Sequence, residues 1–218
     1  GLGDVYKRQA NAGENTRDSV YQNISDYLGI SACRAEAVSA CEDTSFVAPP
    51  TLPIRPPVLC AGCPHRASFY AVKAAMKGRK TIFCGDIGCY TLGNAMPLDM
   101  VDTCLCMGAG LGIAQGIGHI EPDTSCFAFV GDSTFFASAI TGVINAVYNQ
   151  ANMTLIILDN STTAMTGHQP HPGTGRTMMG ELVQKINIEA VLRGIGITTV
   201  ETVNPLDHKA AVSCVKRT

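Results

Sequence analysis

After residue 57, short apolar runs alternate with longer segments in which apolar and polar positions are mixed. Four short apolar runs suit buried strands, at 81–84, 125–130, 154–158 and 196–201. Between and around them lie segments of helical length, at 67–77, 107–117, 135–149 and 186–193. Strands that alternate with helices are typical of βαβ units. We therefore predict an α/β fold, with a mostly parallel sheet and helices on both of its faces.

The first part of the chain has a different pattern. Apolar residues at Val20, Ile24, Tyr27 and Leu28 follow the i, i+4, i+7, i+8 spacing of a short amphipathic helix. Gly29 is placed to cap that helix. Five prolines then fall between residues 48 and 57 and exclude a helix or a central strand there.

These changes predict the domain organisation. We expect an N-terminal tail with a short helix at 1–47, a proline-rich linker at 48–57, one domain at 58–205 and a truncated C-terminal segment at 206–218. The chain does not begin with Met, and residues 214–218 close no recognisable element, so we expect a fragment of a longer protein. Residues 4–9 resemble a translated sequencing adapter and are set aside.

Composition removes several classes of function. The formal net charge is -2 and charged residues make up only 16% of the 218, so no basic surface is available for nucleic acid or anionic lipid. No apolar run reaches the roughly 18 residues of a membrane span, and the polar start is no signal peptide. We expect a cytoplasmic protein, whose ten cysteines stay reduced or bind metal.

Two polar turns follow two of the predicted strands. Gly131-Asp132-Ser133 follows the strand at 125–130, and Asp159-Asn160 follows the strand at 154–158. If the strands are parallel and joined by a right-handed crossover, Asp132 and Asn160 meet at the carboxyl edge of the sheet. A carboxylate, an amide oxygen and a loop carbonyl suit Mg²⁺ that also binds phosphate oxygens. The helix after Ser133 adds amide groups for an anion. Two ordinary turns are the alternative.

Gly131-Asp132-Ser133, followed at a distance by Asn160, resembles the diphosphate-binding motif of thiamine diphosphate enzymes, which is Gly-Asp-Gly followed by Asn-Asn. Ser133 and Asp159 depart from that motif. Residues 50–205 also carry further landmarks in order, and together these resemble the alpha subunit of indolepyruvate:ferredoxin oxidoreductase. The landmarks are Cys60-Ala61-Gly62-Cys63-Pro64-His65, Gly85-Asp86-Ile87-Gly88-Cys89-Tyr90, Met107-Gly108-Ala109-Gly110 and Thr162-Thr163-Ala164-Met165-Thr166-Gly167-His168-Gln169.

The resemblance implies thiamine diphosphate and Mg²⁺ as cofactors. Asp132, Asn160 and the main-chain carbonyl of Thr162 would bind the metal, and Ser133 would contact the diphosphate. The full set of cofactor-binding residues that it implies is Gly88, Cys89, Met107, Gly108, Gly131, Asp132, Ser133, Asn160 and Thr162. For Met107 a plain core position is the alternative.

Three residues beyond the metal loop are candidates for catalysis. His168, Gln169 and His171 follow Asn160 closely, and a histidine there can face a substrate carboxylate or transfer a proton near neutral pH. A solvated loop is the alternative. The histidine at 65 lies after Pro64, where packing or turn capping is as reasonable as catalysis.

The reaction implied by the resemblance is oxidative decarboxylation of indolepyruvate and other aryl 2-oxoacids to the aryl-acetyl thioester of coenzyme A, with reduction of ferredoxin. A beta subunit and a hetero-oligomer are implied partners. The activating glutamate would come from a separate pyrimidine-binding domain, so no acidic residue here is given that role. Three alternatives stay open: a 2-oxoacid:ferredoxin oxidoreductase for a different acid, a non-oxidative thiamine-dependent decarboxylase, and a cysteine-rich metal module without catalysis.

Three cysteines raise the question of an iron–sulfur cluster. Cys60 and Cys63 form a C-x-x-C pair, and Cys89 is a third. The resemblance implies that these three cysteines lie at positions similar to those of the cysteines that hold a [4Fe-4S] cluster in related pyruvate oxidoreductases. Four thiolates are usual, and no convincing fourth is present. A redox pair, or a partial zinc site with His65, is the alternative.

Overall fold

The computed structural model describes residues 16–30 and 53–218. The chain divides into two units, Gly1–Ile54 and Arg55–Thr218. In the first unit, helix α2 (Arg17–Leu28) begins where the Thr16 side chain accepts the amide of Ser19, and it ends at Gly29 in the left-handed conformation, φ 64°. The predicted short helix and its glycine cap are therefore confirmed. The suspected adapter at 4–9 and the first half of the linker, 48–52, lie outside the described residues.

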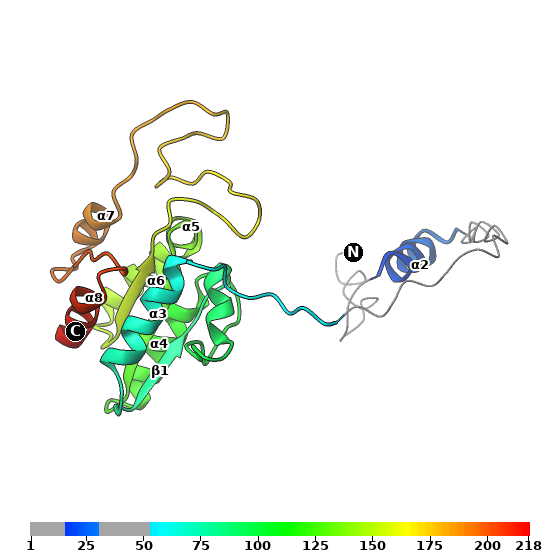
Figure 1. Ribbon diagram of the computed structural model, residues 1–218. Coiled ribbons are helices and arrows are strands. Elements are labelled where there is room, and N and C mark those ends of the chain that lie inside the picture. Colours follow the sequence, from blue (N-terminus) through cyan, green and yellow to red (C-terminus); the bar gives the residue numbers. More distant parts are fainter. Residues whose placement is uncertain (1–15, 31–52) are drawn as a thin grey trace. The chain divides into compact units, whose positions relative to one another are not determined.

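The second unit is built on a three-stranded parallel sheet. Its strands are β1 (Thr81–Cys84), β2 (Ser125–Gly131) and β3 (Thr154–Leu158), in the order β1-β2-β3. Both pairings are parallel, with Thr81 opposite Ser125 and Phe127 opposite Thr154. Three of the four predicted strands are confirmed, and their carboxyl ends lie at one edge of the sheet (Figure 1).

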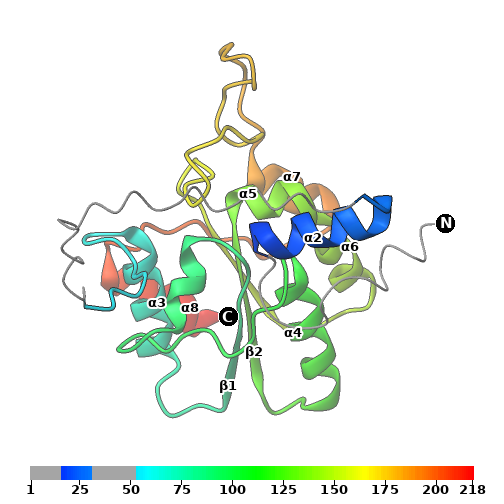
Figure 2. The ribbon, with the colours of Figure 1, turned by 90° about the vertical axis from the view of Figure 1, so that its right-hand side faces the viewer.

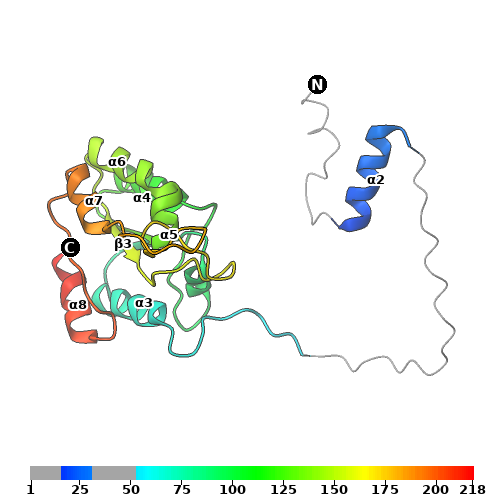
Figure 3. The ribbon, with the colours of Figure 1, turned by 90° about the horizontal axis from the view of Figure 1, so that it is seen from above.

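Helices cover both faces of the sheet, because the side chains of the central strand β2 alternate between two buried clusters. Phe127 and Phe129 pack toward α3 (Pro64–Ala75) and α8 (His208–Arg217). The other face carries Ala128 and Val130. The helices that cover it are α4 (Ala109–Ile120), α6 (Ile140–Tyr148) and α7 (Ile188–Ile195). Figure 3 shows these two layers, and the predicted fold class is confirmed.

The predicted helix at 135–149 has a more complex start than its pattern suggests. It begins directly at the end of β2 as α5 (Asp132–Thr134), continues through a π-helical turn, η2 (Phe135–Ala139), and becomes α6. A π turn inserts an extra residue and shifts the side chains that follow. A 3₁₀-helix, η1 (Cys89–Asn94), was not predicted. Across residues 16–30 and 53–218, no helix has the length and apolarity to cross a bilayer.

The strand predicted at 196–201 is wrong. This segment forms no strand, although Ile197 and Val200 still pack against the core on the α4 side. The guanidinium of Arg193, in the last turn of α7, lies 3.1 Å from the carbonyl oxygen of Thr198 and 3.4 Å from that of Val200. These carbonyls therefore bond to a side chain instead of a neighbouring strand.

The expectation that the last residues close no element is also wrong, since they complete helix α8. Asp207 caps this helix by accepting the amide of Ala210. Val212 and Val215 pack into the cluster that lies under α3. The signal in the sequence was a capping aspartate followed by apolar residues three apart.

Replacing Phe129 tests the central packing. Its ring is fully buried and lies 4.9 Å from the ring of Phe69 and 6.2 Å from that of Phe83, between centroids. Phe129→Ala should lower the free energy of unfolding by about 3–5 kcal/mol, measured by urea denaturation. Tyr148→Ala, at a position 84% exposed, should change it by less than about 0.5 kcal/mol. Similar losses in both variants would contradict this assignment of the core.

Candidate functional site

A cavity of about 160 Å³ opens at the carboxyl edge of the sheet. Its walls are the segments that follow β1, β2 and β3. Eight of the nine residues expected to bind the cofactor line it: Gly88, Cys89, Met107, Gly131, Asp132, Ser133, Asn160 and Thr162. Another cavity, of about 190 Å³, lies at the opposite edge and contains none of them. Parallel pairing has therefore brought together residues far apart in the chain.

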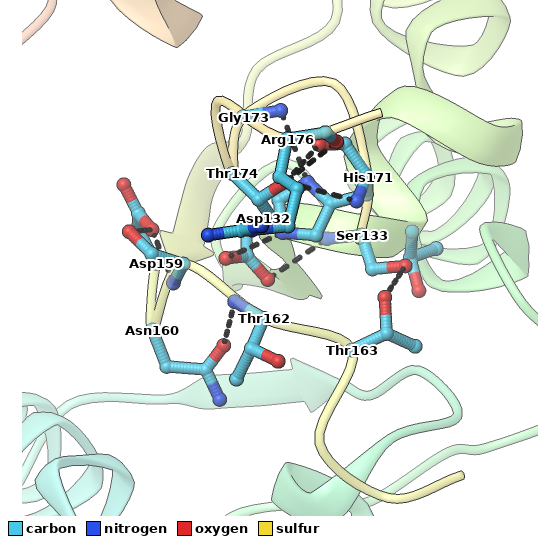
Figure 4. A network of polar contacts seen from close by, with 12 residues as sticks. Asp132, Ser133, Asp159, Asn160, Thr162, Thr163, His171, Gly173, Thr174 and Arg176 are labelled. Atoms are coloured by element: carbon cyan, nitrogen blue, oxygen red, sulfur yellow. Dashed lines mark hydrogen bonds and ion pairs between the residues drawn. The ribbon is translucent and has the colours of Figure 1, made fainter. Parts of the chain in front are cut away.

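Asp132 is the most constrained of these residues, because β2 ends one residue before it and α5 begins with it. Its Oδ1 accepts the amide of Ser133 at 2.8 Å. Its Oδ2 lies 3.2 Å from Nε2 of His171, and both side chains are about 5% exposed or less. Within residues 16–30 and 53–218, neither of these two atoms has a hydrogen-bond partner. Among the described residues, this buried carboxylate oxygen contacts His171 and accepts no hydrogen bond (Figure 4).

The surroundings of Asp132 disfavour the ionised form of its carboxyl group. Burial raises the pKa of this carboxyl group above its ordinary value. The amide of Ser133 and the ring of His171 act in the opposite direction, and the nearby carboxylate of Asp159 raises the pKa further. Two acidic groups that approach each other beside a cavity favour a cation between them.

The loop after β3 folds tightly around its own amides. Asn160 Oδ1 accepts the amide of Thr162 at 3.2 Å, and Asp159 Oδ1 accepts that of Ser161 at 2.9 Å. Thr163 Oγ1 lies 2.8 Å from Ser133 Oγ and joins the loop to α5 (Figure 4). In Figure 2 the segment between β3 and α7 rises from the edge of the sheet at which α5 lies.

This donor set fits Mg²⁺. Asp132 offers an oxygen with no hydrogen bond, Asn160 offers an amide oxygen, and the main-chain carbonyl of Thr162 comes from the same loop. Hard oxygen donors of these kinds are the ligands that Mg²⁺ prefers. The fit depends on one observation, the buried Asp132 oxygen that accepts no hydrogen bond from the described residues.

Comparison with known proteins gives the family. Residues 86–216 match the model for the thiamine pyrophosphate enzyme, C-terminal TPP binding domain. The chain belongs to this family of thiamine pyrophosphate enzymes.

Curated relatives agree with the motif-based resemblance. The indolepyruvate oxidoreductase subunit IorA of Archaeoglobus fulgidus is 45% identical over 199 residues, which is 91% of this chain and 32% of that protein. The same subunit of Methanothermobacter thermautotrophicus is 46% identical over 173 residues, 77% of this chain and 28% of that protein. The chain therefore spans about a third of the length of these relatives.

A solved structure confirms the fold. The 2-oxoglutarate:ferredoxin oxidoreductase from Magnetococcus marinus, with 2-oxoglutarate, coenzyme A and succinyl-CoA bound, superposes with a TM-score of 0.64. The match covers 75% of this chain and 60% of that one, at 21% sequence identity. At that identity the likeness shows a common fold and no more.

In this thiamine pyrophosphate enzyme domain, the residues expected to take part in catalysis lie away from the cavity. His168 is exposed, with φ 62°, and Gln169 bonds to Thr166 within the loop. His171 is buried on the far side of Asp132. Its Nδ1 accepts the amide of Gly173 at 3.2 Å. None of the three side chains lines the cavity, and their role in catalysis stays a prediction.

The three cysteines considered for a cluster lie at the starts of two helices, Cys60 and Cys63 just before α3 and Cys89 at the first residue of η1. Cys60 is exposed and Cys63 is half-buried. Burial raises the pKa of the Cys89 thiol, and the neighbouring Cys63 and Cys60 raise it less. In the part of the chain that the structure describes, no three His, Cys, Asp or Glu side chains are arranged to hold a metal ion. A [4Fe-4S] cluster on Cys60, Cys63 and Cys89 stays a prediction.

Sequence reasoning missed two residues beside the cavity. Asp86 is fully buried just beyond β1, and Tyr90 lines the cavity from η1. Asp86 carries the same sequence signal as Asp132, because both acidic residues lie just beyond the end of a buried strand.

The buried histidine of α3 gives a pH prediction. His65 is 4% exposed and lies edge-on to the ring of Tyr90, 5.7 Å between centroids. Burial lowers its pKa below 6.5, so the unfolded chain binds this proton more readily than the folded chain. The free energy of unfolding should therefore fall as the pH drops below about 6.5. Between pH 7 and pH 5, the free energy of unfolding should fall less in His65→Gln than in the wild type, as measured by urea denaturation. An equal fall in the variant and the wild type would contradict this account.

Proposed function

We propose that this chain is the part of an indolepyruvate:ferredoxin oxidoreductase that binds thiamine diphosphate through Mg²⁺. The enzyme would convert indolepyruvate and other aryl 2-oxoacids, with coenzyme A, to aryl-acetyl-CoA while it reduces ferredoxin. The observation that carries this proposal is the cavity where Asp132, Asn160 and Thr162 meet, in a chain of the thiamine pyrophosphate enzyme family. The two relatives described above are indolepyruvate oxidoreductase subunits, which supports the choice of substrate.

Each wall of the cavity has a separate task in this proposal. Asp132, Asn160 and the Thr162 carbonyl would hold Mg²⁺, and Ser133 would contact the diphosphate. The chemistry that bound thiamine diphosphate supplies is carbanion stabilisation beside the keto carbon, while the protein orients the reactants and excludes water. Met107, which is 45% exposed at the cavity, offers an apolar contact for the rest of the cofactor.

The size of the cavity supports a shared site. Pockets for small molecules usually measure about 300–1,000 Å³, and this one measures about 160 Å³. We propose that a pyrimidine-binding domain outside residues 58–205 completes it and brings the activating glutamate. The beta subunit and ferredoxin would bind as partners in a hetero-oligomer in the cytoplasm. Electrons would pass to iron–sulfur clusters elsewhere in the complete protein.

Removing the proposed metal ligand tests the cofactor assignment. Asp132→Ala in the complete enzyme should weaken Mg²⁺-dependent binding of thiamine diphosphate at least about a hundredfold in titration calorimetry, because changes outside the ligand shell alone cost about 10–100-fold. Asp123→Ala is the matched control, at an exposed position beside the opposite edge of the sheet. Unchanged affinity in Asp132→Ala would overturn the metal assignment.

A substrate comparison tests the reaction. The complete enzyme should reduce ferredoxin with indolepyruvate and coenzyme A, and it should do so more slowly with 2-oxoglutarate or pyruvate. The measurement is kcat/KM for each acid, followed by ferredoxin absorbance. Faster turnover of another acid would reassign the specificity. Aldehyde release without an electron acceptor would indicate a non-oxidative decarboxylase instead.

A further inference from the structure

A second buried carboxylate lies beside the cavity, at the end of β1. The side chain of Asp86 has no exposure to solvent. Within the described ranges, none of the ion pairs that the structure forms includes it. A buried carboxylate without a cation depends on strong hydrogen-bond donors. The positions of those donors are therefore fixed by Asp86.

The two donors come from different segments of the chain. Asp86 Oδ1 accepts the amide of Gly108 at 2.7 Å, and Oδ2 accepts the hydroxyl of Tyr90 at 2.7 Å. Gly108 has φ 85° and immediately precedes α4. Tyr90 belongs to η1. One carboxylate thus joins the end of β1 to two other walls of the site.

The hydroxyl of Tyr90 extends this connection to the turn after β2. Its oxygen lies 3.1 Å from Thr134 Oγ1 and 3.2 Å from the carbonyl oxygen of Ile87. A phenol has one proton, and the short contact with a carboxylate takes it. Thr134 must then donate to Tyr90. The result is a directed chain, from Thr134 to Tyr90 to Asp86.

The ring of Tyr90 also fixes the other side of that turn. A Cβ atom placed on Gly131 would lie 2.5 Å from Cε1 of Tyr90, and one on Gly88 would lie 2.4 Å from the same atom. The ring is therefore packed against both glycine backbones. Gly131 immediately precedes Asp132, and Thr134 lies two residues after Asp132. Tyr90 contacts the chain on both sides of the proposed metal ligand.

We propose that Asp86 is a positioning residue for the thiamine diphosphate site. Through Tyr90 it holds the turn at residues 131–134 that carries Asp132, and through Gly108 it holds the start of α4 on the cavity wall. Asp86 itself touches neither metal nor cofactor. This role rests on the proposed function, because it assumes that the cavity binds the cofactor.

The experiment compares variants of the complete enzyme for binding of thiamine diphosphate with Mg²⁺, by calorimetry. Tyr90→Phe removes one hydroxyl, and Asp86→Asn cannot accept from both donors. Each should weaken cofactor binding about tenfold. The matched control is Gln115→Met, which removes a buried 3.1 Å hydrogen bond from Gln115 to the Gly142 carbonyl, between α4 and α6. It should lower the Tm of the cofactor-free protein by a similar amount and leave cofactor affinity unchanged.

A double variant tests the directed chain. Thr134→Val should also weaken binding, but Tyr90→Phe with Thr134→Val should be no weaker than Tyr90→Phe alone, because both changes break the same link. Losses that multiply would overturn the chain. Variants that bind as tightly as the wild type would overturn the positioning role alone. A wild-type enzyme that does not bind thiamine diphosphate would overturn the proposed function as well.

Discussion

The site depends on the parallel pairing of β2 with both of its neighbours. This pairing places the residues that follow all three strands at one edge: Asp86 after β1, Asp132 after β2 and Asn160 after β3. In a sheet covered by helices on both faces, that edge is where polar groups can lie close to a cavity. The remaining geometry of the site follows from how each polar group is satisfied there.

The two buried carboxylates, Asp86 and Asp132, differ in how many of their oxygens accept a hydrogen bond. Both oxygens of Asp86 accept short hydrogen bonds from the protein. Asp132 has one oxygen bonded to a neighbouring amide and one oxygen without a donor, and the carboxylate of Asp159 lies nearby. A fully satisfied buried carboxylate organises the structure around it, whereas an unsatisfied one has free energy to gain from a cation. The same residue type thus has two roles at one edge.

Features of the fold and the site that depend on neighbouring residues in the sequence could be predicted, whereas those that depend on contacts between distant residues could not. The buried runs of β1, β2 and β3 and the turn at Asp132 are local patterns, and the sequence predicted them well. The segment at 196–201 has a strand-like composition, but Arg193 binds two of its carbonyls. The link from Tyr90 to Thr134 spans 44 residues, so no local pattern indicates it. The position of His171 behind Asp132 likewise depends on how the loop folds.

The most direct test of the account is the position of a divalent cation in a crystal of the complete enzyme, grown with thiamine diphosphate and with Mn²⁺ in place of Mg²⁺. Manganese accepts the same oxygen donors and gives an anomalous signal. The account predicts one strong peak bonded to oxygens of Asp132, Asn160 and Thr162. A peak elsewhere, or cofactor density with no metal between these residues, would contradict it.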